Sequence, residues 1–238
     1  MDPTDLKTRA LALRAAGNTP KQIARALGVP RARATALVRG VPVAKPKRPE
    51  PADLPLVGCW ITRQWSNGLT IADRPADWLD DAELPPLAMG AGLASVAVAR
   101  ENDTNGITVG GFLVDTYCLG AKNALRENLV DREDLMFYLD EFFGGYDTEP
   151  LAAPISLARE VVFGAVDYAR GLGFDPHPDF RLAAPYLGSW QPPGRITFGR
   201  EGKPFFQQGP YDDPDRVMRT LDRTIGPGDY HFSVVATE

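Results

Sequence analysis

Hydrophobic and polar residues in the first forty positions repeat at the spacing of short α-helices. Leu6, Ala10 and Leu13 stand at i, i+4 and i+7. This spacing predicts a first helix that begins at Pro3 and ends at Gly17, because proline is favoured at the first helical position and glycine just after a helix end.

Two more short helices are predicted directly after the first. Thr19 and Gln22, three residues apart and flanking Pro20, form the pattern of a capping box at a helix start. Gly28 predicts a turn, and the segment from Pro30 to Arg39 predicts a third helix rich in alanine and arginine.

After residue 55 the pattern mixes strand and helix signals without the regular alternation of a doubly wound fold, which predicts an α+β domain. The run from Ile107 is almost continuously apolar and should be an interior strand. The expected elements are a strand from Leu93 and a strand from Ile107 joined by a turn at Asn105-Gly106, helices over 131–143 and 156–170, a hairpin turning at Glu201-Gly202, a helix opened by Asp213-Pro214, and a terminal strand over 229–235.

Composition places the chain among ordinary globular proteins. It has 238 residues, of which 44% are hydrophobic and 24% charged. No run approaches the roughly 18 apolar residues of a membrane helix, and the acidic, polar start from Met1 to Asp5 differs from a signal peptide. Two cysteines are too few for a disulfide scaffold. We therefore expect a cytoplasmic protein that does not enter membranes.

The formal net charge of -5 conceals two segments of opposite sign. Residues 1–50 contain eleven Lys and Arg against three Asp and Glu, a net charge of +8, whereas the remainder carries -13. A small basic segment joined to a larger acidic one indicates that the first segment meets a polyanion. We predict a small all-α domain over 1–40, a linker over 41–55 and the acidic α+β domain over 56–238.

The stretch TPKQIARALGVPRARATALV, residues 19–38, resembles the helix-turn-helix of recombinases, transposases and many bacterial regulators. Five positions carry the resemblance: a small residue where two helices cross, the turn glycine and its neighbour, and two inward positions of the next helix. They are Ala24, Gly28, Val29, Ala34 and Leu37.

The resemblance implies that the helix from Pro30 to Arg39 enters the major groove of double-stranded DNA. Arg31 and Arg33 would then read guanines, and Thr35 would touch a thymine methyl group or a phosphate. Lys21, Arg25 and Arg39 would bind phosphates. Pro30 departs from the usual capping serine or threonine. The alternative use of this segment is protein docking or dimerisation, with the arginines only keeping it soluble.

The predicted linker contains five prolines, which favour extended backbone and a semi-rigid spacer. They are Pro42, Pro46, Pro49, Pro51 and Pro55. Lys45, Lys47 and Arg48 are further candidate contacts to phosphates or to a minor groove. The alternative is a solvated linker.

No nucleotide-binding, zinc-protease or serine-hydrolase motif occurs in the acidic domain, so we expect no cofactor. Asp115 ends an apolar strand, and together with Glu160 and Asp167 it offers three carboxylates for Mg²⁺-dependent cleavage of nucleic acid. The alternative is that Asp115 caps the following turn while the other two solvate a helix.

Three further sets of residues are candidates for catalysis, metal binding or ligand binding. Cys118 would be a nucleophile if His177 or His231 lay beside it, but its apolar surroundings favour an inert buried thiol. In DPHPDF, Asp175, His177 and Asp179 offer metal ligands, with local loop contacts as the alternative. The aromatic residues Trp190, Phe205, Phe206 and Tyr211 line either a pocket or the core.

These patterns favour a DNA-binding transcriptional regulator whose acidic domain forms a homodimer or binds a small effector or a protein partner. A nucleic-acid-processing enzyme, such as a metal-dependent nuclease or a recombination accessory factor, is the second hypothesis. The third is an adaptor in which both domains bind proteins. Salt dependence of DNA binding and Mg²⁺-dependent strand loss separate the three.

Overall fold

The computed structural model describes residues 3–42, 49–80, 91–102 and 106–234. The chain divides into two compact units, unit 1 from Met1 to Pro49 and unit 2 from Glu50 to Glu238, and each is described by itself. Helices and a five-stranded antiparallel sheet are both present among the described residues, which confirms the α+β class.

Unit 1 consists of α1 (Pro3–Ala15), α2 (Pro20–Leu27) and α3 (Arg31–Leu37). The hydroxyl of Thr19 accepts a hydrogen bond from the Gln22 amide, and the Gln22 side chain accepts one from the Thr19 amide, so the capping box is formed. Gly28 has a φ of 64°, in the left-handed region that glycine adopts without strain. α3 is shorter than the expected 30–39: Pro30 stands at its N-cap without a side-chain hydrogen bond, and the helix ends at Leu37, followed by Val38 at the C-cap.

The core of unit 1 is small and combines alanine with a few larger aliphatic residues. Ala10, Ile23 and Ala34 are completely buried, one from each helix. Alanine at two of these positions lets the three helix backbones approach closely, and Ile23 is the one large side chain among the three. The stability of this unit therefore depends on few apolar groups.

The main sheet of unit 2 has the strand order β5-β4-β3-β1-β6, with every neighbouring pair antiparallel. The strands are β1 (Leu56–Ile61), β3 (Leu93–Glu101), β4 (Ile107–Asp115), β5 (Gly120–Leu129) and β6 (Leu151–Ala152). β3 and β4 form the expected hairpin, and β4 is an interior strand. Part of its tip, 103–105, lies outside the described residues.

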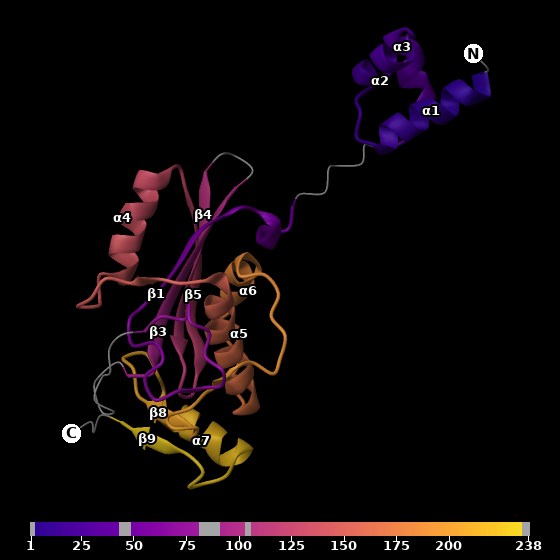
Figure 1. Ribbon diagram of the computed structural model, residues 1–238. Coiled ribbons are helices and arrows are strands. Elements are labelled where there is room, and N and C mark those ends of the chain that lie inside the picture. The colour runs from indigo at the N-terminus through magenta and orange to yellow at the C-terminus, as the bar shows by residue number, and fades with distance from the viewer. Residues whose placement is uncertain (1–2, 43–48, 81–90, 103–105, 235–238) are drawn as a thin grey trace. The chain divides into compact units, whose positions relative to one another are not determined.

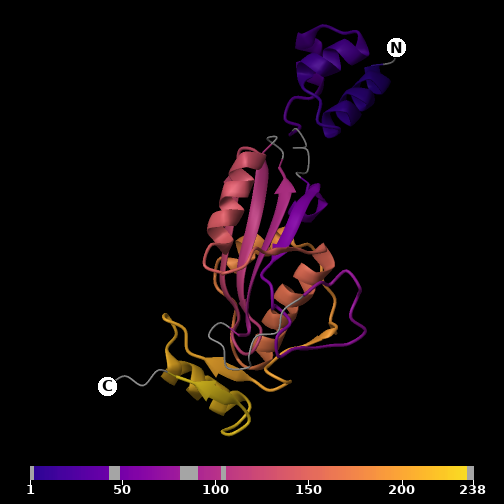
Figure 2. The same ribbon diagram turned by 60° about the vertical axis from the view of Figure 1, so that its left-hand side comes forward.

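The two faces of the sheet are covered unequally. α5 (Ile155–Gly171) and α6 (Phe180–Ala183) lie on one face and α4 (Arg132–Phe143) on the other (Figures 1 and 2). The two long helices were expected from their apolar spacing. Asp131 caps α4, and its carboxylate accepts hydrogen bonds from the amides of Glu133 and Asp134.

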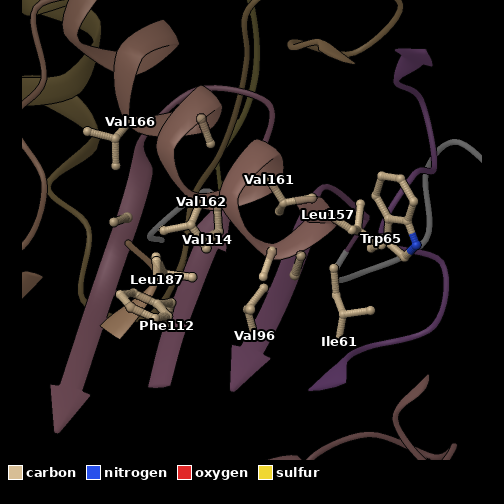
Figure 3. Packing of buried hydrophobic residues seen from close by; sticks show 14 of the residues in the cluster. Ile61, Trp65, Val96, Phe112, Val114, Leu157, Val161, Val162, Val166 and Leu187 are labelled. Atoms are coloured by element: carbon tan, nitrogen blue, oxygen red, sulfur yellow. The ribbon is translucent and has the colours of Figure 1, made fainter. Parts of the chain in front are cut away.

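The larger core lies between α5 and the sheet, as Figure 3 shows. Leu157, Val161 and Val162 of α5 point toward Val96 and Phe112 of the strands. All five side chains are completely buried. A continuous apolar layer of this kind accounts for most of the hydrophobic content of the chain.

The smaller elements at the end of the chain differ from the expectation of a second hairpin. A turn is present at Glu201-Gly202, and Arg200 and Lys203 bridge across it. The strands on either side pair elsewhere: β7 (Ile196–Thr197) pairs with β2 (Thr70–Ile71), and β8 (Phe205–Gln207) pairs in parallel with β9 (His231–Ser233). α7 (Pro214–Thr224) and the terminal strand β9 were expected.

Residues 50–55, assigned to the linker from their prolines, are held against unit 2. They include the short helix η1 (Pro51–Asp53), and the Arg100 guanidinium donates hydrogen bonds to the carbonyls of Leu54 and Tyr186, the latter in η2 (Ala184–Tyr186). The amide of Glu101 also donates to the Pro55 carbonyl. The spacer therefore ends earlier than the proline pattern indicates.

Candidate nucleic-acid interface

The outward side of α3 combines small side chains with arginines. Ala34 and Val38 face the core, so the opposite side of the helix carries Ala32 and Ala36 at its outermost positions. Arg31 and Arg33, both exposed, flank this ridge of two alanines on opposite sides. A ridge of methyl groups between two long cations lets the helix backbone approach a surface closely while the guanidinium groups reach past it.

The side chains of α2 add a second column of cations. Lys21 and Arg25 are one helical turn apart, and both are exposed on the side away from the buried Ile23 and Leu27. The capping box at Thr19 fixes the start of the helix and so the direction of this column. Arg39, also exposed, follows the end of α3.

None of the five cations Lys21, Arg25, Arg31, Arg33 and Arg39 forms an ion pair with a described residue. Asp5 is the one acidic residue in the described part of unit 1, 3–42 and Pro49, and it lies on α1. Their charge is therefore not neutralised within the described part of the unit and is available to a polyanion.

Thr35 is more constrained than the sequence suggests. Its hydroxyl donates a hydrogen bond of 2.9 Å to the carbonyl of Arg31, one turn earlier in α3. The hydroxyl hydrogen is thus used within the helix, which is a common arrangement for threonine in helices. Thr35 was expected to touch either a thymine methyl group or a phosphate. The hydrogen bond to Arg31 is compatible with the first contact, which the Thr35 methyl group makes.

Arg14 has a structural role that the sequence analysis did not assign. Its guanidinium donates hydrogen bonds to the carbonyls of Val41 and Asn18 and so ties the chain after α3 back to the end of α1. Lys7 and Arg9 of α1 are exposed and were also not assigned. Charge alone identifies such residues, but it does not separate those that hold the fold from those that face solvent.

The basic residues of the linker cannot be placed. Lys45, Lys47 and Arg48 lie outside the described residues, which leave out 43–48. Their expected contact with phosphates stays a prediction from the sequence.

The three carboxylates considered for a nuclease do not come together. The Asp115 carboxylate accepts hydrogen bonds from the amides of Tyr117 and Cys118 and so holds the turn between β4 and β5. Glu160 accepts a hydrogen bond from the Arg195 amide, and Asp167 is exposed on α5. Among the residues described, no three His, Cys, Asp or Glu side chains gather as metal ligands.

Burial raises the pKa values of two groups in this turn, the Asp115 carboxyl and the Cys118 thiol. Removal of Asp115 from water raises the pKa of its carboxyl from 3.8 to about 6, although the hydrogen bonds from backbone amides and the charge of Lys122 oppose the change. Burial, with the nearby Asp115 carboxylate, also raises the pKa of the Cys118 thiol. Cys118 is completely buried and belongs to an apolar cluster, so it is an inert core thiol.

The remaining candidates of the acidic unit also have local structural roles. In DPHPDF, the His177 ring accepts a hydrogen bond from the Asp179 amide, which is a contact within the loop. Phe206 is completely buried whereas Tyr211 is 99% exposed, so the aromatic residues do not form one cluster. Trp190 stacks on Phe163 instead.

Comparison of the chain with models of protein families, with curated proteins and with solved structures finds no match. None of the helices in the described part of the chain has the length and apolar character needed to cross a bilayer. A function for this chain is therefore inferred from its own geometry and charge.

Proposed function

We propose that the protein binds double-stranded DNA through unit 1 and regulates transcription. One observation carries the proposal: five cations on α2, on α3 and just after it are exposed and have no acidic partner among the described residues. A polyanion that supplies phosphates at regular spacing is the ligand that such a surface favours, because binding releases condensed counterions.

The proposed reading element is α3. Its ridge of Ala32 and Ala36 permits close approach to the floor of a major groove, and Arg31 and Arg33 extend on either side toward base edges. An arginine that binds guanine through both O6 and N7 discriminates against other bases by about 1–3 kcal/mol. Specificity in this proposal depends on these two arginines, because the alanines between them supply no hydrogen bonds.

The other cations position the helix. Lys21 and Arg25 on α2, and Arg39 after α3, contact phosphates in this proposal and so set the register of α3 without reading sequence. A single unit of this size offers few phosphate contacts. Pairing of two copies through unit 2 would double them and fix the spacing of half-sites, and an effector or a protein partner bound to unit 2 would regulate that pairing.

The test is a titration of the full-length protein against a pool of duplex genomic fragments in the presence of Mg²⁺. The proposal expects a subset of fragments to be retained intact, and their shared sequence defines the site. Mg²⁺-dependent loss of strands would favour a nuclease instead. Retention of no fragment even at low salt would contradict DNA binding and favour a protein-docking role for unit 1.

A further inference from the structure

On the face of the sheet that α4 covers, a groove lies between α4 and the edge strand β5. Its volume is about 550 Å³. Alternate residues of β5 form one wall, and residues of α4 at helical spacing form the other. The lining consists of Leu125, Glu127 and Leu129 from β5 and of Asp134, Phe137, Tyr138, Glu141 and Phe142 from α4.

The floor of the groove is apolar and fixed. Tyr138 and Phe142 stack with their ring centres 5.7 Å apart, and both pack over Gly111 of β4. A Cβ atom at Gly111 would lie 2.9 Å from the Phe142 ring and 3.0 Å from the Tyr138 hydroxyl, so glycine is what lets these two side chains pack this close to the sheet. The packing of Tyr138 and Phe142 over Gly111 therefore fixes the floor of the groove.

The groove has one large apolar side chain exposed at its wall. Phe137, which lines the groove, is 71% exposed. Met136, the preceding residue of α4, is 58% exposed but lines a different pocket, together with Leu139 and Phe143. An exposed phenylalanine beside an apolar floor gives a partner a large apolar contact area at this groove.

The rim of the groove is acidic. Glu127, Asp134 and Glu141 are all exposed, and none forms an ion pair with a described residue. From Glu127 to Glu149 the sequence has eight Asp and Glu against one basic residue, Arg132. Burial raises the pKa of the Tyr138 hydroxyl, and the carboxylates of Glu127 and Glu141 raise it further, which places both carboxylates near the floor of the groove.

The Tyr138 hydroxyl is also unsatisfied. It is buried and has no hydrogen-bond partner among the described residues. A buried hydroxyl without a partner has a free-energy cost, which the surrounding packing must offset. The hydroxyl lies against Gly111, so it belongs to the packed floor of the groove, and the polar contacts available to a partner are the carboxylates of the rim.

We propose that the groove between α4 and β5 binds a basic, amphipathic α-helix of a partner protein, with an apolar side chain of that helix beside Phe137 and a Lys or Arg between Glu127 and Glu141. Residues 134–142 span about 12 Å along α4, which matches about two turns of a bound helix. A second copy in a symmetric contact would bring two acidic rims together, and the rim also repels nucleic acid. The proposal is independent of DNA binding by unit 1.

The test uses a fluorescent synthetic helix of about 15 residues, with Leu at i, i+3, i+4 and i+7 and Lys on both flanks, and measures its anisotropy with the full-length protein. Two control peptides carry Glu in place of Lys, or the same residues in scrambled order. The Lys peptide is expected to bind at least about tenfold more tightly than both controls.

Matched variants locate the binding. Phe137→Ser and the double variant Glu127→Lys, Glu141→Lys are each expected to weaken the Lys peptide about tenfold or more. The controls Tyr211→Ser and the double variant Asp77→Lys, Asp175→Lys change another exposed aromatic residue and the same charge outside the groove, and should leave binding unchanged. Tryptophan fluorescence checks that each variant is folded.

Three outcomes would overturn the proposal. The first is that no peptide binds or that the three peptides bind equally. The second is that the groove variants bind the Lys peptide as tightly as the control variants Tyr211→Ser and Asp77→Lys, Asp175→Lys do. The third is sedimentation showing a dimer of the wild-type protein that Phe137→Ser dissociates, since a second copy would then be the occupant.

Discussion

Arginine serves two different purposes in the two units of this chain. In unit 2, Arg100 is 5% exposed and donates to the carbonyls of Leu54 and Tyr186, and Arg159 donates to the Leu187 carbonyl. In unit 1, Arg31 and Arg33 are exposed and pair with no described acidic residue.

The difference shows how to distinguish cations that hold a fold from cations that are free to bind. An arginine that donates to buried carbonyls is held in place by them, and its loss leaves those carbonyls unsatisfied. An arginine without such partners contributes little to stability. Unit 1 contains both kinds, since Arg14 donates to the carbonyls of Val41 and Asn18, whereas the cations on α2 and α3 have no ion-pair partner among the described residues.

The largest expected effect comes from the small core of unit 1. Ile23→Ala removes its fully buried isoleucine and should cost about 3 kcal/mol in the free energy of unfolding. A domain with so small a core has a low free energy of unfolding, so this loss should unfold unit 1 and abolish DNA binding. Circular dichroism and a DNA titration measure the two effects.

The four tryptophans all belong to unit 2 and provide the control. Denaturation followed by tryptophan fluorescence should give the same midpoint for Ile23→Ala and the wild type. A shifted midpoint would show that the two units stabilise one another and would break the comparison.

Buried charge in unit 2 should make its stability depend on pH through Asp115. The carboxyl has a folded-state pKa of about 6 against an ordinary 3.8, so the folded state holds the proton more tightly. The stabilisation this provides is fully present below pH 3.8 and is lost as the pH rises through about 6, with an amplitude of about 3 kcal/mol.

Asp115→Asn removes this titration and keeps an oxygen that accepts from the Tyr117 and Cys118 amides. Its stability relative to the wild type should rise by about 3 kcal/mol across that pH range. Urea denaturation at several pH values, followed by tryptophan fluorescence, measures the difference. A difference that stays constant with pH would show that the carboxyl titrates alike in both states.

The third effect tests the structural arginine. Arg100→Ala leaves the carbonyls of Leu54 and Tyr186 without this donor and should lower the stability of unit 2 by about 2–3 kcal/mol. Arg126→Ala, at an exposed position of β5, is the matched control and should change stability by less than about 0.5 kcal/mol. Equal losses for the two variants would remove the distinction between the two kinds of arginine.

Substitutions of the exposed cations of unit 1 should have the smallest effects on stability and a direct effect on DNA binding. Arg31→Ala and Arg33→Ala should each weaken binding to preferred duplexes by about 1–3 kcal/mol, whereas Lys21→Ala should weaken all duplexes alike. Competition between a retained fragment and random duplex measures the difference. Equal losses on every sequence would refute Arg31 and Arg33 as readers of bases.

Local signals identified the elements whose caps and apolar spacing lie close together in sequence. The capping box at Thr19, the Gly28 turn and the helix start at Asp213 all form as expected. β5 was not expected, because its sequence GAKNALRENL buries few residues and has no continuous apolar pattern. An edge strand of this kind is specified by pairing with β4 more than by its own residues.

Long-range partners explain the other differences. The residues around Glu201-Gly202 were expected to form a hairpin. Instead, β8 pairs in parallel with β9, and α7 connects these two strands along the chain. The contacts of Arg100 join three distant segments, which no local pattern shows. The cations of the candidate interface were identified from charge and helical spacing, while the groove beside α4 required the packing of Tyr138 over Gly111.

The most direct test of the account is the salt dependence of DNA binding by the full-length protein. With three phosphate contacts, from Lys21, Arg25 and Arg39, a plot of the logarithm of the binding constant against the logarithm of salt concentration should have a slope of roughly -3, and Lys21→Ala should make it shallower by about 1. A slope near zero, or no binding at low salt, would contradict the claim that these unpaired cations form a nucleic-acid interface.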